Sequence, residues 1–121
     1  MARIPKILKE ALKNVLGKPF TEMYPFEKKP VPEGFRGRHE VNIERCTGCS
    51  ICVKICPAQC IQLIEVKRAD TGEAKLVPSV DLAACLFCGL CEEFCEHSAI
   101  RMGSYYELAS VNKADLILRP S

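Results

Sequence analysis

The sequence lacks a long apolar run. Hydrophobic residues make up 48% of its 121 residues, but no run approaches the roughly 18 apolar residues that a membrane-spanning helix requires. We therefore expect a chain that does not cross a bilayer. A secretory signal peptide is also missing, and the nine cysteines are an odd number. Because a disulfide framework normally goes with an oxidising compartment and an even count, the sequence disfavours structural disulfides.

Eight of the cysteines form two runs with the same spacing, C-x2-C-x2-C-x3-C. The first cysteine run is Cys46, Cys49, Cys52 and Cys56, and the second cysteine run is Cys85, Cys88, Cys91 and Cys95. A structural zinc site favours two C-x2–4-C pairs and would leave a cysteine over in each run, so zinc is disfavoured. The ninth cysteine, Cys60, precedes the apolar Ile61. We expect it to be a small buried hydrophobic residue, since a ligand role would break the spacing.

The repeated spacing resembles that of the bacterial two-cluster ferredoxins. This resemblance implies two [4Fe-4S] clusters with crossed ligation, in which the fourth cysteine of each run binds the cluster of the other run. Cluster 1 is then held by Cys46, Cys49, Cys52 and Cys95, and cluster 2 by Cys85, Cys88, Cys91 and Cys56. Each oxidised cluster with four thiolates carries about −2, so the formal charge of +2 becomes about −2 in the loaded protein. A nucleic-acid partner is therefore not expected.

The residues around the cysteine runs predict an α+β fold, a ferredoxin-like domain of pseudo-twofold βαββαβ order. The expected elements are a strand at His39–Glu44, a helix at Val53–Gln59, a strand at Ile61–Lys67, a hairpin turn at Ala69–Glu73, a strand at Lys75–Val80, a helix at Gly89–Phe94 and a strand at Ile100–Met102 that closes the sheet. Gly48 and Gly89 lie inside the runs, where we expect the backbone to approach the cluster sulfurs closely. A core this small is marginal on apolar burial alone, so the clusters must contribute to folding.

The N-terminal segment predicts an amphipathic helix. Its apolar residues recur at helical spacing and form one stripe: Ile4, Ile7, Leu8, Ala11, Leu12, Val15 and Leu16. Residues 1–20 also hold five basic groups against one acidic group, Glu10. The stripe could cover the protein's own core, a membrane surface or a partner protein, and we favour a partner close to a bilayer surface. A mitochondrial targeting peptide is disfavoured by the single arginine, the acid and the lack of serine.

The following segment predicts an extended arm. Prolines and glycines are too frequent between Lys18 and Arg38 for regular structure. The arm also carries four aromatic residues, Phe20, Tyr24, Phe26 and Phe35. These favour an arm that lies along another protein over a flexible linker, because linkers are usually polar. We thus predict residues 1–38 as helix and docking arm, 39–103 as the two-[4Fe-4S] ferredoxin domain and 104–121 as a C-terminal docking tail.

One difference separates the two runs. Pro57 follows the first run, whereas Glu96 and His97 follow the second. The charge of Glu96 could lower the potential of the nearby cluster, or it could be a solvated carboxylate without redox effect. His97 and His39 could titrate with electron transfer. We expect both to be ordinary surface groups, since neither is spaced as a ligand.

The flanking residues resemble a particular family, the two-cluster ferredoxin subunit of respiratory complex I and of its relatives, the membrane-bound hydrogenases, formate hydrogenlyases and sulfur-reducing complexes. The segments that carry the resemblance are Thr21-x-x-Tyr24-Pro25, Phe35-Arg36-Gly37-Arg38-His39, the run from Asp81 to Glu93, and Tyr106-Glu107-Leu108-Ala109-Ser110. It implies an electron-relay subunit without catalytic residues, peripheral on the cytoplasmic face of the cell membrane. It also implies a small partner subunit with the next cluster, a catalytic-core-like partner subunit, a membrane surface near the N-terminal helix, and subunit contacts at residues 36–39.

Other functions stay open at this point. The short tail after Ser110 favours the hydrogenase or sulfur-reductase branch, but the terminal acceptor could be quinone, protons or a sulfur compound. A free soluble ferredoxin would have the same core, although it would not need the N-terminal extension and the tail. A regulatory iron–sulfur sensor ranks last, because eight ligands are supplied where a sensor would want an incomplete site.

Overall fold

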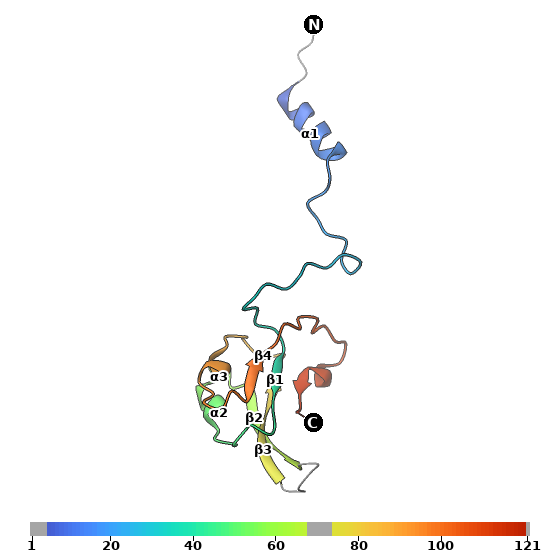
Figure 1. The fold of residues 1–121 in the computed structure, drawn as a ribbon. Helices are drawn as coiled ribbons and strands as arrows, with labels where there is room; N and C mark the ends of the chain where they lie inside the picture. The colour runs from blue at the N-terminus through green and yellow to red at the C-terminus, as the bar shows by residue number, and fades with distance from the viewer. Residues whose placement is uncertain (1–4, 68–73, 121) are drawn as a thin grey trace. The chain divides into compact units, whose positions relative to one another are not determined.

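The structure, a computed structural model, describes residues 5–67 and 74–120 and has an α+β fold with antiparallel sheets (Figure 1). Its elements are α1 (Lys6–Leu16), β1 (His39–Val41), α2 (Ile51–Ile55), β2 (Ile61–Lys67), β3 (Ala74–Asp81), α3 (Leu90–Glu93), β4 (Ile100–Met102), the 3-10 helix η1 (Lys113–Leu116) and β5 (Ile117–Leu118). The chain divides into one unit that ends at Pro30 and a second that begins at Val31. The pseudo-twofold relation between the two halves of the second unit stays a prediction.

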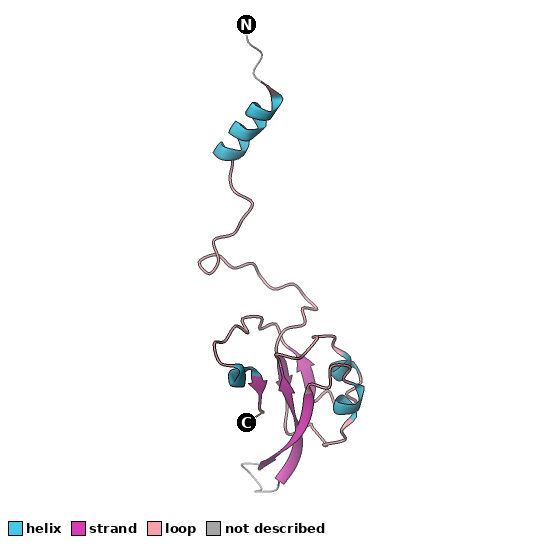
Figure 2. Ribbon diagram, turned by 180° about the vertical axis from the view of Figure 1, so that it is seen from behind, coloured by secondary structure: helices cyan, strands magenta, loops and turns pink. Residues whose placement is uncertain are grey.

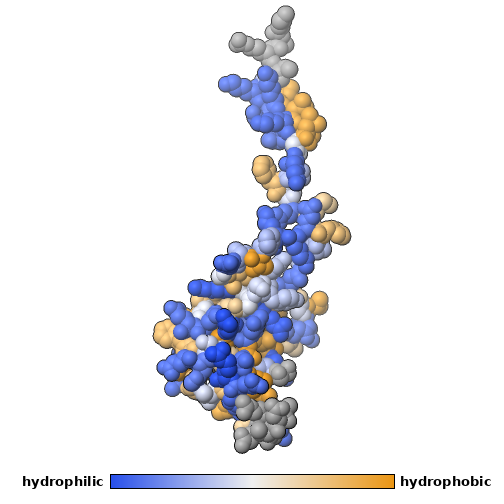
Figure 3. Space-filling model, viewed as in Figure 1, coloured by the Kyte–Doolittle hydropathy of each residue, from blue (hydrophilic) through white to orange (hydrophobic). Residues whose placement is uncertain are grey.

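The amphipathic helix is confirmed as α1. It begins after Pro5 and ends at Leu16, and the backbone becomes extended at Gly17. None of its residues is buried, and apolar side chains gather along one side of it, with Ile7 at 81% exposure (Figure 3). No helix in the described part of the chain is long and apolar enough to cross a membrane. An isolated helix of 11 residues is marginal in water, so this stripe needs a surface to cover.

The segment from Gly17 to Arg38 has turns but neither helix nor strand, as its prolines predict. Its aromatic side chains are exposed, including Phe26 at 88%. The prediction of an irregular segment is therefore confirmed for its backbone, and what covers the aromatic residues stays a prediction.

The sequence predicted that the strand at Ile100–Met102 closes a single sheet, and the structure differs from this prediction. β4 pairs antiparallel with β1 in a separate two-stranded sheet, with His39 opposite Met102. β1 also ends at Val41 rather than Glu44, because the chain turns at Asn42 and the Asn42 carbonyl oxygen accepts a hydrogen bond from the Cys46 N–H (3.2 Å). The early turn brings Cys46 back toward the core, where it is buried.

The second sheet has the order β2-β3-β5. The predicted hairpin is confirmed by the long antiparallel pair of β2 and β3, with Ile61 opposite Val80 (Figure 2). The predicted turn at Ala69–Glu73 lies outside the described residues. On its other edge β3 pairs with β5, so that Val80 is opposite Leu118, and Ser79 Oγ donates a hydrogen bond to the Leu118 carbonyl oxygen (3.0 Å). The C-terminal segment is thus joined to the core through Leu118, which is only 9% exposed.

The helix near the end of the first cysteine run is shifted from its predicted place. It covers Ile51–Ile55 instead of Val53–Gln59, so Cys56 lies just beyond it in an extended conformation (φ −70°, ψ 112°). Pro57 explains the shift, since a proline disfavours the helical conformation of the residue before it. The second helix, α3, falls inside its predicted range. The two helices lie side by side next to the strands (Figure 1).

The core is small and includes cysteine side chains. The largest fully buried residues are Ile100, Val77 and Val80. One apolar cluster contains Cys60 and Cys91, and a second contains Cys46. The buried part of the domain therefore lies directly against the predicted ligands.

Candidate iron–sulfur site

The first predicted ligand group lines one pocket. Cys46, Cys49 and Cys52 of the first run face it together with Cys95 of the second run. The pocket has about 390 Å³, counting the part open to solvent, and its other lining residues include Leu63, Pro78 and Ile100. Three neighbouring thiols and a fourth from a distant part of the sequence thus border one largely apolar space.

The second predicted group gathers around Cys91. Its side chain is buried in the core, with Cys56 and Cys85 among the partly buried residues packed against that core. Burial, together with the neighbouring Cys85 and Cys88, raises the pKa of the Cys91 thiol to about 12. Cys56 thus lies in the same core region as Cys85 and Cys91 of the second run.

Backbone N–H groups point at two of the predicted ligands. The N–H of Phe87 donates to Cys85 Sγ (3.3 Å), and the N–H of Ala99 donates to Cys95 Sγ (3.2 Å). Hydrogen bonds of this kind stabilise the thiolate form that iron binds, and in iron–sulfur proteins they help to set the reduction potential.

The glycines of the two runs have the conformation that close approach requires. Gly48 and Gly89 have φ of +72° and +82°, a region that favours glycine. A Cβ atom at Gly48 would also lie 3.1 Å from the Leu76 carbonyl oxygen. Side chains at these positions would therefore disturb the ligand loops.

The buried thiols ionise reluctantly by themselves. Burial raises the pKa of Cys52, and the neighbouring Cys49 and Cys46 raise it as well. Thiolates can form here once a positive centre offsets burial and mutual repulsion, and the ferric and ferrous ions of a cluster supply one. The donor set, all sulfur and partly buried, fits [4Fe-4S] clusters.

No group of three or more His, Cys, Asp or Glu side chains within residues 5–67 and 74–120 could hold a metal ion at a single point. In a [4Fe-4S] cluster each of the four thiolates binds a different iron, so the ligands need not converge on one point.

The ninth cysteine contacts a predicted ligand. Cys60 is buried, as expected, and its Sγ lies 3.5 Å from Cys56 Sγ. Burial and the hydrogen bond with Cys56 raise the pKa of Cys60 to about 12. Burial opposes ionisation of Cys56, but hydrogen bonds from the Cys60 backbone and side chain hold its pKa below the ordinary value. The thiol of Cys60 therefore contacts a predicted ligand, and the spacing of the sequence did not indicate this contact.

The environment of His39 was missed as well. The expectation of a surface group is wrong, because His39 is 2% exposed and its ring lies 5.9 Å from the ring of Phe87. Burial lowers its pKa, against an opposing effect of Glu92. Its strict alternation with Val41 in a strand could have indicated an inward side chain. His97 is exposed, as expected. Glu96, for which a redox effect and a solvated carboxylate were both considered, is exposed as well.

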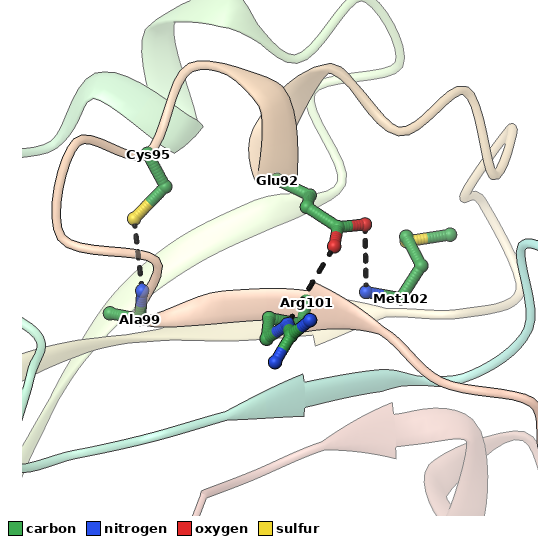
Figure 4. Close-up of polar contacts among 5 residues, drawn as sticks. All are labelled: Glu92, Cys95, Ala99, Arg101 and Met102. Atoms are coloured by element: carbon green, nitrogen blue, oxygen red, sulfur yellow. Dashed lines mark hydrogen bonds and ion pairs between the residues drawn. The ribbon is translucent and has the colours of Figure 1, made fainter. Parts of the chain in front are cut away.

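Glu92 joins the second run to the first sheet. Its Oε2 accepts a hydrogen bond from the Met102 N–H (3.0 Å), and its Oε1 lies 3.9 Å from Arg101 Nε (Figure 4). The first contact ties α3 to β4. Cys95, beyond the end of α3, accepts a hydrogen bond from the N–H of Ala99, the residue before β4. These contacts thus join the C-terminal part of α3 and the residues after it to β4 and the residue that precedes it.

Comparison with known proteins agrees with this site. Residues 45–100 match the model of the 4Fe-4S dicluster domain family. The chain is thus a protein with a two-cluster iron–sulfur domain.

Relatives and a solved structure are similar over most of the chain. NADH-quinone oxidoreductase subunit I 2 of Geobacter metallireducens is 32% identical over 114 residues, which cover 91% of this chain and 87% of the relative. NAD(P)H-quinone oxidoreductase subunit I of Gloeobacter violaceus is 35% identical over 100 residues, covering 82% of this chain and 48% of the relative. A chain in the structure of the membrane-bound sulfane sulfur reductase, an archaeal respiratory membrane complex, is 29% identical, with a TM-score of 0.64, covering 95% of this chain and 62% of that one.

The protein belongs to the family of NADH-quinone oxidoreductase subunit I, the two-cluster ferredoxin subunit of complex I and its relatives. Its cofactors are two [4Fe-4S] clusters, and it is an electron-transfer iron–sulfur protein. The resemblance to this family is thereby confirmed. The chain spans about half the length of the Gloeobacter relative and less than two thirds of the sulfane sulfur reductase chain.

Proposed function

We propose that this protein relays single electrons, through its two clusters, as a peripheral subunit of a complex I-related membrane-bound oxidoreductase of the hydrogenase, sulfur-reductase or quinone-reductase type. The observation that carries the proposal is the pocket that joins Cys95 of the second run to three cysteines of the first. A duplicated, crossed ligand set is typical of two-cluster electron carriers.

The proposed ligands follow the crossed order, which comes with the proposed pseudo-twofold βαββαβ arrangement. Cluster 1 is held by Cys46, Cys49, Cys52 and Cys95, and cluster 2 by Cys85, Cys88, Cys91 and Cys56. Each cluster, when bound, accepts and releases one electron. The protein holds the ligand sulfurs with backbone N–H groups, as at Phe87 and Ala99, and excludes water with apolar residues such as Leu63 and Ile100.

The partners are the other subunits of the membrane complex. One is a small subunit that carries the next cluster, and another is a catalytic-core-like subunit. The exposed apolar stripe of α1 and the exposed aromatic residues before β1 support such contacts, since a freely diffusing ferredoxin does not need them. We further propose that α1 lies near the membrane surface, on its cytoplasmic face, with its lysines toward anionic lipid headgroups.

The experiment is anaerobic purification of the chain alone and together with the products of its neighbouring genes. We expect about eight irons per chain, from two clusters of four. We also expect EPR signals of two reduced [4Fe-4S] clusters, and improved solubility or stability in the co-expressed sample.

Zinc in place of iron, or half the expected iron, would contradict the two-cluster site. A chain that is soluble and monodisperse alone, and that reduces many unrelated partners, would favour the free ferredoxin instead.

A further inference from the structure

Two side chains from the segment Phe35-Arg36-Gly37-Arg38-His39 contact the second cysteine run within this chain. The resemblance to the complex I subunits implied that Arg36 to His39 lie at subunit contacts. In the structure, His39 contacts Phe87 and Arg36 contacts Gly89. These two contacts flank Cys88, a proposed ligand of cluster 2.

The contact of Arg36 is close. A Cβ atom at Gly89 would lie 3.1 Å from Arg36 Nε and 3.4 Å from Arg36 Cζ, so the guanidinium group covers the space that a side chain would occupy. Gly89 has a φ of +82° and precedes α3. The positive charge of Arg36 therefore lies against the backbone between Cys88 and Cys91.

The contact of His39 with Phe87 holds the residue that precedes Cys88 in place. Its ring is buried and lies 5.9 Å from the Phe87 ring. Its Nδ1 has no hydrogen-bond partner among the described residues. The N–H of Phe87 in turn donates a hydrogen bond to Cys85 Sγ (3.3 Å). The packing of His39 against Phe87 therefore also affects the position of Cys85, a second proposed ligand.

The backbone between these two residues is anchored independently. The N–H of Gly37 donates to the Gly103 carbonyl oxygen (2.9 Å), and the N–H of Arg38 donates to the Tyr105 carbonyl oxygen (2.8 Å). A Cβ atom at Gly37 would lie 2.7 Å from the Gly103 carbonyl oxygen. The backbone beside Arg36 is thereby fixed to the segment that follows β4.

We propose that the positive charge of Arg36, which lies against Gly89, raises the reduction potential of cluster 2. His39 is a positioning residue that holds Phe87 in the same loop. The inference rests on the proposed electron relay. Reduction adds a negative charge to a cluster, and a nearby cation stabilises the reduced state. Because Arg36 is exposed, added salt should weaken its effect.

The test compares Arg36→Gln, Arg36→Lys and the matched control Arg38→Gln in the holoprotein. Arg38 is also exposed and is two residues away, but it faces grooves lined by Tyr105 and Leu118. The measurement is a redox titration of both clusters by EPR at low and high salt. Cluster 2 is the one whose signal is lost when Cys88, a ligand from the second run itself, is changed to Ser.

We expect Arg36→Gln to lower the midpoint potential of cluster 2 and to leave cluster 1 unchanged. Arg36→Lys should keep the midpoint near the wild-type value, and Arg38→Gln should change neither cluster. The gap between Arg36→Gln and wild type should shrink at high salt. No shift in Arg36→Gln, equal shifts in the Gln and Lys variants, or an equal shift in Arg38→Gln would overturn the proposal.

If Arg36→Gln does not retain cluster 2, the salt dependence of the midpoint potentials is measured on the wild type and on Arg36→Lys instead. A cluster 2 midpoint that falls with salt more steeply than that of cluster 1 supports the proposal, and equal salt dependence overturns it. A wild-type chain with fewer than two clusters would instead contradict the proposed function itself. Two intact clusters with unchanged potentials would contradict this inference alone.

Discussion

At the scale of single residues, the cysteines differ in their surroundings although their spacing is repeated. Cys46 and Cys91 are buried, while Cys49 is exposed. Cys56 follows a helix in extended backbone and contacts Cys60, whereas Cys95 accepts a backbone hydrogen bond from Ala99. The eight predicted ligands, all of one chemical type, are thus held by different local contacts.

The proposed crossed ligation predicts which cluster Cys56 binds. In a Cys60→Ser background, Cys56→Ser should remove cluster 2 and leave cluster 1, halving the iron content. The background matters because Cys60 Sγ, 3.5 Å from Cys56 Sγ, could otherwise take its place. Iron analysis and EPR of the double variant measure the result. The control is Cys60→Ser alone, which should keep both clusters, and loss of cluster 1 in the double variant would show that the ligation is not crossed.

The sequence predicted the candidate ligands because their pattern is local. The crossed order came with the resemblance to two-cluster ferredoxins. The contacts of His39 and Arg36 could not be predicted in the same way, since each depends on packing between segments distant in sequence. Cys60 is only four residues from Cys56, but the contact of their sulfur atoms depends on the bend of the chain after α2, which the spacing does not show. His39 lies 48 residues before Phe87, its ring partner.

At the scale of secondary structure, hydrophobic periodicity predicted β2, β3 and α1 well. The errors in element boundaries occurred where a single polar residue or proline determines the backbone conformation. Asn42 ends β1 early, and Pro57 keeps Cys56 out of α2. The pairing of β4 with β1 alone could not be read from the sequence, because short strands carry little information about their partners.

The edge strand β5 depends on a buried hydrogen bond. Ser79→Ala should lower the free energy of unfolding by about 1 kcal/mol, because the Leu118 carbonyl oxygen loses its side-chain donor. Denaturant unfolding of the holoprotein under anaerobic conditions measures the change. Ser110→Ala is the matched control, since the Ser110 hydroxyl bonds to Asp115 in an exposed place. Equal effects of the two substitutions would contradict a special role for the buried bond.

At the scale of the whole molecule, the cofactors compensate for a small core. The fully buried large side chains number three among the described residues, and a domain of this size gains little stability from apolar burial alone. The predicted domain boundaries at residues 38 and 103 stay predictions. The pairing of β5 with β3 does, however, join part of the C-terminal segment to the core.

The exposed stripe of α1 should decide whether the subunit stays with its complex. Changing both Leu8 and Leu12 to Gln should strongly reduce co-purification with the products of the neighbouring genes, since exposed apolar side chains in contiguous stripes mark binding sites. Changing Lys9 and Lys13 to Gln is the matched pair on the other face, and it should weaken association with membranes in a salt-dependent way. The iron content of both variants should stay at the wild-type value, and undiminished co-purification of the Leu variant would contradict docking through α1.

The exposure of Cys49 has a consequence for handling the protein in air. Oxygen and peroxide attack a cluster through its most accessible sulfur and iron atoms, and Cys49 is the exposed cysteine of the pocket that also contains the buried Cys46. Oxidative damage should therefore begin at cluster 1 and spare cluster 2 for longer. Brief aeration would then leave a half-loaded chain with an interrupted path for electrons.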